Sequence, residues 1–93
     1  MEIKHHFEGS KGEFYIEENG HVVAQYAYTM TDDTTMLATH TGVSPRLRGQ
    51  GIAMKLVEAA VEYARAHNYK IAPSCSYVRW AHETRPDLAD VIR

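Results

Sequence analysis

A short segment rich in glycine and arginine, Arg46-Leu47-Arg48-Gly49-Gln50-Gly51, connects a predicted strand to the clearest predicted helix. The first backbone amides of a helix have no internal partner, and a Ser, Thr, Asp or Asn usually caps them, but no such cap stands here. Gly49 and Gly51 leave the amides accessible, and the helix dipole favours negative charge beside them. Arg46 and Arg48 add forked donors suited to phosphate oxygens. The segment predicts a binding site for phosphate or pyrophosphate.

Two familiar nucleotide-binding motifs do not fit this turn. No Gly-Lys-Ser/Thr follows it, as a Walker loop requires, and it lacks the Gly-x-Gly-x-x-Gly of a dinucleotide-binding fingerprint. A simpler interpretation stays open, in which the glycines only permit a tight strand-to-helix turn and the arginines are solvated. The missing helix cap favours the anion site over that alternative.

The elements that position the turn can be predicted from hydrophobic periodicity. Alternation predicts strands at Glu13 to Glu17, His21 to Met30 and Thr35 to Val43, and the Asn19-Gly20 pair is typical of a tight hairpin turn between the first two. In the second strand, Val22, Ala24, Tyr26, Tyr28 and Met30 are expected to face the core. In the third strand, strict alternation places His40 on the same face as the apolar Met36 and Ala38.

A helix is predicted from about Gly51 to Asn68, because apolar residues recur there at helical spacing and Asn68 can end the helix in a left-handed conformation. Tyr69 to Cys75 reads as a short strand in which Pro73 cannot donate to a neighbour, so sheet pairing should fail near it. Ser76 to Glu83 predicts a second, short helix with Ser76 as its cap, followed by an amphipathic tail from Leu88 to Ile92. The predicted fold class is α+β.

Length, composition and net charge limit the number of domains and the kinds of partner. The 93 residues predict one domain, residues 1–93, without a membrane-spanning run or a secretory signal, which makes the cytoplasm the default location. Cys75 is the single cysteine, so no internal disulfide is expected, and no paired Cys or His spacing predicts a metal site. A net charge of −2 argues against a nucleic-acid partner held by general phosphate neutralisation.

Arg46-Leu47-Arg48-Gly49-Gln50-Gly51 resembles the Arg/Gln-x-x-Gly-x-Gly/Ala motif with which GNAT-superfamily N-acetyltransferases hold the pyrophosphate of coenzyme A. More narrowly, His40-Thr41-x-Val43, Arg48 to Ala53 and Pro73-x-Cys75-Ser76-Tyr77-Val78 look like the small YjdJ-like GNAT subfamily. The chain departs from that subfamily's pattern at Arg46, where an acidic residue is usual, and at Arg85-Pro86-Asp87-Leu88, where His-Pro-Glu-Tyr is frequent.

The resemblance implies a minimal GNAT fold, a mostly antiparallel mixed sheet with one long helix after the phosphate turn, strands splayed near the coenzyme and a short C-terminal helix. It implies acetyl-coenzyme A as cosubstrate, with no metal. The coenzyme-binding residues it implies are Val43, Arg46, Arg48, Gly49, Gln50, Gly51, Ile52 and Ala53.

Acetyl transfer needs a deprotonated amine, a stabilised oxyanion and a leaving thiolate that is accepted or protonated. His40, just before the turn, is a candidate general base, although a hydrogen-bonded structural histidine is the plain alternative. Cys75 is a candidate nucleophile or thioester-pocket residue, with a buried inert thiol as its alternative. Strand pairing is expected to bring His40 near Cys75, so the two form one hypothesis. Tyr77 is a candidate acid for the coenzyme thiolate, by likeness to larger GNAT enzymes, or a packing residue.

Larger GNAT enzymes place helices between their own first two strands, and these helices build much of the acceptor pocket. In this chain only Glu8 to Gly12 could connect the corresponding strands. An open acceptor site is therefore expected, suited to a protein side chain, an amino terminus or a polyamine. Two other functions stay open: a non-catalytic sensor of coenzyme A or its thioesters, and a domain whose basic turn meets nucleic-acid phosphate. The net acidity disfavours the latter.

Overall fold

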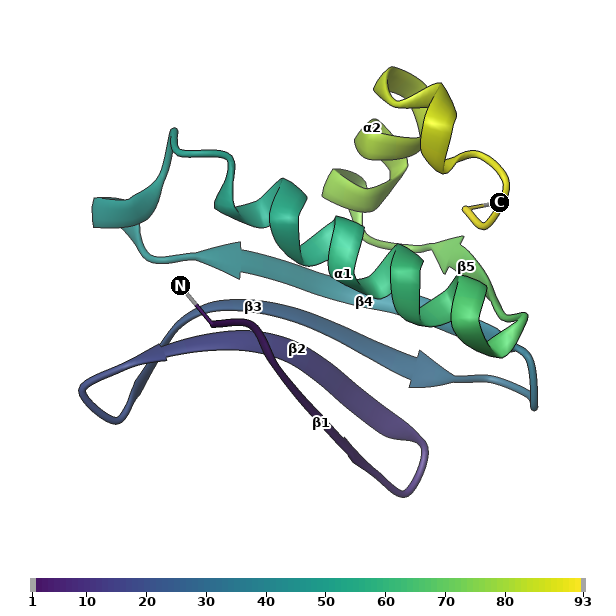
Figure 1. Cartoon of the computed structure of the whole chain (residues 1–93), viewed down its shortest axis with the longest axis horizontal. Coiled ribbons are helices and arrows are strands. Elements are labelled where there is room, and N and C mark those ends of the chain that lie inside the picture. The colour runs from purple at the N-terminus through teal and green to yellow at the C-terminus, as the bar shows by residue number, and fades with distance from the viewer. Residues whose placement is uncertain (1, 93) are drawn as a thin grey trace.

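The computed structural model of the chain describes residues 2–92 and shows five strands, two helices and two short 3-10 turns (Figure 1). In chain order these are β1 (Lys4–Glu8), β2 (Lys11–Glu18), β3 (His21–Met30), β4 (Thr35–Val43), the turn η1 (Pro45–Leu47), α1 (Ile52–His67), β5 (Lys70–Pro73), α2 (Ser76–Thr84) and the turn η2 (Pro86–Leu88). The strands form one sheet in the order β1-β2-β3-β4-β5, antiparallel except for the parallel pair β4 and β5. The predicted α+β class, with a mostly antiparallel mixed sheet, is confirmed.

The local signals for turns and helix ends act as predicted. Asn19 and Gly20 both have positive φ, 52° and 79°, as a tight hairpin between β2 and β3 requires. Asn68 ends α1 with a φ of 59°, and its backbone N–H bonds to carbonyls of the last helical turn. The predicted bounds of β3 and β4 are those of the structure.

One face of the sheet is covered and the other is open. The apolar stripe of α1 packs across the sheet, and α2 packs against α1, β4 and β5 (Figure 1). Side chains that point from the strands toward α1 are buried: Phe14, Ile16, Ala24, Tyr26, Tyr28, Met36, Ala38 and Ile71. Those that alternate with them are half-buried or exposed. Within residues 2–92, none of the helices has the length and hydrophobicity to cross a bilayer.

An irregularity in β4 changes which face its later residues occupy. Ala38 pairs with Tyr28 and His40 pairs with Ala27, so Thr39 is an extra residue between two consecutive positions of β3. Such a bulge shifts the alternation by one residue. His40 therefore lies on the open face with Ala27, and Thr41, opposite Tyr26, lies on the face covered by α1. The prediction that His40 shares the face of Met36 and Ala38 was wrong for this reason.

Pairing between β4 and β5 ends at Ala38 and Pro73, as predicted from the missing amide of proline. The Cys75 N–H then bonds the Ala38 carbonyl at 2.9 Å, and the chain turns away into α2. Among residues 2–92, the edge of β4 from Thr39 to Val43 has no strand beside it on the β5 side. The strands are thus splayed at this point.

The predicted cap of α2 was wrong by one residue. Ser76 is the first helical residue, and Cys75 occupies the cap position with an extended backbone. The chain turns at Cys75 because its amide is still held by Ala38 of β4. A cysteine, not a serine, therefore lies at the amino-terminal end of this helix.

The C-terminal segment is fastened to α1 by ion pairs. Arg85 bridges Glu58 at 3.0 Å and Asp87 at 2.7 Å, and Arg65 bonds Asp90 at 2.8 Å. The buried side chains of the predicted amphipathic tail are Leu88, Val91 and Ile92. Arg85-Pro86-Asp87-Leu88 thus holds the tail and α2 in place on α1.

Candidate active site

The amino-terminal end of α1 presents unpaired backbone donors. The helix begins at Ile52, and its first amide with a carbonyl partner is that of Lys55, bonded to Gly51 at 3.2 Å. The amides of Ile52 to Met54 lack a helical partner, and no side chain caps them. Gly49 and Gly51 have φ values of 83° and 74°, and a Cβ added to either would meet open space. The glycines are needed for their left-handed backbone, and they leave room for an anion over the amides.

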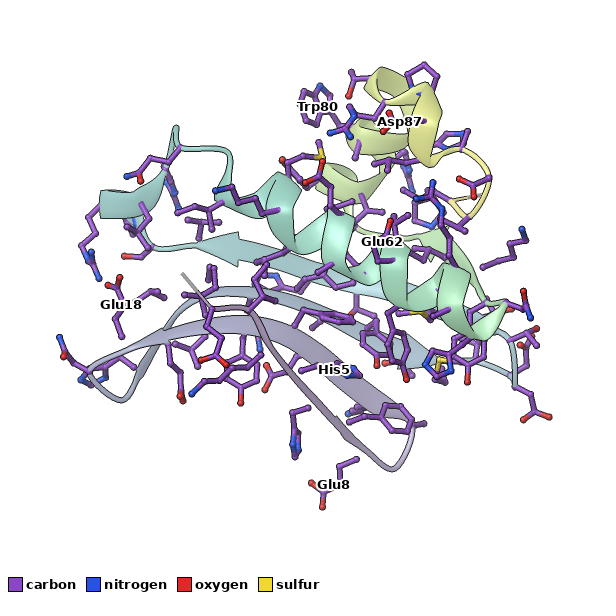
Figure 2. The ribbon with its side chains drawn as sticks, in the orientation of Figure 1. His5, Glu8, Glu18, Glu62, Trp80 and Asp87 are labelled. Atoms are coloured by element: carbon purple, nitrogen blue, oxygen red, sulfur yellow. The ribbon has the colours of Figure 1, made fainter. Side chains whose placement is uncertain are left out.

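The two arginines of the turn have different partners. Arg46 pairs with Glu18 at the β2–β3 hairpin, which Figure 2 shows near the segment before α1. The Arg48 Nε donates to the Val43 carbonyl at 3.2 Å, which ties the arginine to the end of β4. Both side chains are exposed. Arg48 therefore lies within the turn itself, whereas Arg46 must exchange Glu18 for any anion that it binds.

The other residues implied in coenzyme binding flank this turn. Val43 is half-buried on the face toward α1, opposite Ala24. Ile52 is buried in the core, Ala53 is half-buried and Gln50 is exposed. Ile52 therefore anchors the start of the helix, and Gln50 lies in the turn just before the free amides.

The single cysteine lies at the start of α2, facing β4. Cys75 is half-buried, and its Sγ donates a hydrogen bond to the Thr41 Oγ1 at 3.4 Å. Burial raises the pKa of the thiol, but hydrogen bonds from the Thr41 hydroxyl and from the amides of Val78, Tyr77 and Thr41 together lower the pKa below its usual value. The amides of Tyr77 and Val78 belong to the first turn of α2, where the helix dipole also favours a thiolate.

A prediction follows for thiol reactivity. Thr41→Val is expected to move the midpoint of the alkylation profile of Cys75 upward by about one pH unit, because the thiolate loses one hydrogen bond that favours it. The measurement is the rate of iodoacetamide alkylation against pH, which follows the thiolate fraction. Because the chain has one cysteine, the signal has one source.

The matched control for this experiment is Thr39→Val. Thr39 lies on the same strand, but its hydroxyl donates to the Ala27 carbonyl at 3.2 Å, on the open face of the sheet. The midpoint should stay where it is in wild type. Equal midpoints in Thr41→Val and wild type would contradict the assigned contact between Thr41 and Cys75.

His40 lies exposed on the open face, with its imidazole over the backbone of Gly42. A Cβ added to Gly42 would come within 3.0 Å of the His40 Nε2, so glycine at this position makes room for the ring. A groove of about 620 Å³ lies on this part of the molecule. It is lined by His6, Glu8, Lys11, Gly12, Glu13, Ala27, Tyr28, Thr29 and Thr39. Two of these, Ala27 and Thr39, are the direct neighbours of His40 on β3 and β4.

The third candidate, Tyr77, lies in the first turn of α2. Burial and the nearby carboxylate of Glu58 raise the pKa of its phenol, which keeps the group protonated. Its ring packs against Trp80 with centroids 5.4 Å apart, and Figure 2 shows Trp80 on the outer side of α2. Tyr77 is therefore a protonated donor two residues after Cys75.

The structure brings Cys75 together with Thr41 and Tyr77, and it sets His40 on the opposite face of β4. The predicted pairing of His40 with Cys75 was wrong, because the bulge exchanges His40 for Thr41 on the covered face. The sequence analysis did not single out Thr41 as a site residue, because hydropathy gives no signal in the polar run from Thr39 to Thr41. Within the described residues, no three His, Cys, Asp or Glu side chains gather as metal ligands.

A family model described as GCN5-related N-acetyl-transferase matches residues 13–91, which include the turn, β4 and Cys75. The chain belongs to this family. The predicted GNAT resemblance and the predicted class, a GNAT-type acetyltransferase, are thereby confirmed.

Solved structures agree with this GNAT assignment. An NMR structure of a GCN5-like candidate N-acetyltransferase from Staphylococcus aureus is 37% identical, with a TM-score of 0.75, and the match covers 99% of this chain and 87% of that one. An IAA acetyltransferase from Bacillus cereus is 24% identical, with a TM-score of 0.62 over 80% of this chain and 53% of its own. A GNAT family acetyltransferase from Elizabethkingia anophelis with acetyl-CoA bound is 21% identical, with a TM-score of 0.57 over 67% and 41%.

The last two likenesses show the fold alone. The matches cover about half the length of those larger proteins. The family match, residues 13–91, covers most of β2 and all of β3, β4, α1, β5 and α2.

Proposed function

We propose that this GNAT protein transfers an acetyl group from acetyl-coenzyme A to an amine, which is a protein side chain, an amino terminus or a polyamine. The observation that carries the proposal is the uncapped start of α1, where Gly49 and Gly51 leave three amides free in front of open space. A pyrophosphate would accept hydrogen bonds from these amides, and the helix dipole would favour its charge. Arg48 adds positive charge within the same turn.

Cys75 and His40 would act from opposite faces of β4. The lowered pKa of Cys75 supports a role as nucleophile or as a lining of the thioester pocket. Its place beside the unpaired edge of β4 supports the same role. His40, exposed on the open face, would take a proton from the acceptor amine as that amine attacks. Tyr77 would protonate the departing coenzyme thiolate.

The open groove beside His40 supports an acceptor that needs little enclosure. Glu8 and Glu13 place two carboxylates along it, and Lys11 is the cation among its lining residues. A protonated amine would therefore be attracted before His40 accepts its proton. This arrangement favours a lysine side chain or a polyamine over a neutral metabolite.

The test is a titration of the protein with acetyl-coenzyme A by calorimetry, followed by intact mass measurement without an acceptor. Saturable binding together with one acetyl group on Cys75 is expected. Binding without a mass gain would point to direct transfer or, if no amine is acetylated in a panel of lysine peptides and polyamines, to a non-catalytic sensor of the coenzyme. Absence of binding would overturn the proposal.

A further inference from the structure

The hydroxyl of Tyr26 is buried without a hydrogen-bond partner. Tyr26 lies in β3 on the face covered by α1, with no exposed surface, and its Oη has no partner among residues 2–92. Tyr28, two residues later on the same face, is equally buried, but its Oη is 2.7 Å from the His5 Nε2. Buried hydroxyl groups are nearly always paired, because an unmade hydrogen bond destabilises the fold. The unpaired hydroxyl of Tyr26 is therefore an exception that needs an explanation.

The surroundings of Tyr26 indicate what that explanation is. Tyr26 is directly opposite Thr41 in the pairing of β3 with β4, and Thr41 is the residue whose Oγ1 lies 3.4 Å from the Cys75 Sγ. Side chains of such a cross-strand pair lie next to each other on the same face. Burial raises the pKa of Tyr26 and keeps its phenol protonated, and the charge of a Cys75 thiolate raises that pKa further.

We propose that Tyr26 is a positioning residue for Cys75, whose hydroxyl donates a hydrogen bond to the sulfur once the thiol has lost its proton. In the thiol form, the Sγ donates to Thr41, and Tyr26 has no role. In the thiolate form, the sulfur only accepts, so the hydroxyl groups of Thr41 and Tyr26 both stabilise it. No proton leaves Tyr26, and the thiolate keeps its charge for attack on the thioester carbonyl. This inference rests on the role proposed for Cys75.

The experiment compares Tyr26→Phe with wild type in the pH profile of iodoacetamide alkylation of Cys75. The midpoint of the profile is expected to rise by about one pH unit in Tyr26→Phe, a tenfold loss of thiol acidity. The matched control is Tyr28→Phe, which removes a hydroxyl from the same strand and face but one that is bonded to His5. An unchanged midpoint in Tyr26→Phe would overturn the proposal.

A second readout separates this role from a structural one. At a pH well below the measured alkylation midpoint of Cys75, where the thiol is protonated, Tyr26→Phe should melt at the same temperature as wild type or higher, since it removes an unpaired buried hydroxyl. Tyr28→Phe should melt lower, because it loses a hydrogen bond. A lower melting temperature for Tyr26→Phe would mean that the hydroxyl has a structural partner, and would overturn the proposal.

A measurement on the wild-type chain covers the case in which Tyr26→Phe does not fold. The ¹³Cζ chemical shift of Tyr26 should titrate with the same midpoint as Cys75 and should lose that step in Cys75→Ala. A shift independent of Cys75 would contradict the proposal. All three measurements work without an acceptor or acetyl-coenzyme A, so wild-type inactivity would refute the proposed function while leaving this test intact.

Discussion

Gly51→Asp is expected to weaken the binding of acetyl-coenzyme A on the order of 100-fold while the protein stays folded. Asp tolerates the left-handed backbone of Gly51 better than most residues do. Its carboxylate at the cap position is stabilised by the positive end of the helix dipole. The same carboxylate would occupy the free amides of Ile52 to Met54 and repel a pyrophosphate, by up to about 4 kcal/mol per charge pair near a protein surface. Calorimetric titration measures the loss, and thermal unfolding verifies the fold.

The matched control is Gly51→Asn, which has the same shape without the charge. Asn can also cap the helix, so binding should fall, but only about tenfold. The difference between Asp and Asn isolates the electrostatic part of the effect. Acetyl-coenzyme A binding by Gly51→Asp within about twofold of wild type would show that the coenzyme is held elsewhere.

Cys75→Ala is expected to lower turnover by at least about 10³-fold and to leave the dissociation constant of acetyl-coenzyme A within about twofold, as loss of a nucleophile should. The acetyl group detected by intact mass should also disappear. The physical reason is that the Ala side chain cannot form a thioester, whereas the amides proposed to bind the coenzyme lie at the start of α1 and do not involve Cys75. The measurements are steady-state kinetics, calorimetry and mass spectrometry on the same preparation.

Two other variants locate the effect. Cys75→Ser keeps a hydroxyl that can form a hydrogen bond with Thr41. Its melting temperature should therefore be closer to that of wild type than the melting temperature of Cys75→Ala is, while its turnover should stay as low. His40→Ala should lower kcat/KM for the amine about 100-fold and retain acetylation of Cys75, because the imidazole lies on the other face of β4. Full turnover in both Cys75→Ala and His40→Ala would exclude the roles proposed for these two side chains.

The bounds of the main elements could be predicted because each has a strong local cause. Asn19-Gly20 supplies two positive φ values for the hairpin, and the apolar spacing of α1 is unambiguous over four turns. The uncapped turn before α1 could also be predicted, because the absence of a cap before Ile52 and the glycines around it are properties of consecutive residues. Pro73 predicted the end of the pairing between β4 and β5, because proline has no backbone N–H to donate. The single domain, the YjdJ-like subfamily and the individual site roles stay predictions.

What the sequence by itself determined is therefore the strands from β2 onward, the two helices, the uncapped glycine turn before α1 and, through its motif, the GNAT family. The strand β1 was not predicted. Tertiary structure alone decided which side chains meet. From Thr39 to Thr41 all three residues are polar, so hydropathy carries no information about the face that each occupies. The bulge arises from the register with β3, a contact between residues far apart in the chain, and it places His40 on the open face and Thr41 beside Cys75. The ion pair between Arg46 and Glu18 and the unpaired hydroxyl of Tyr26 likewise depend on long-range packing, which no local pattern encodes.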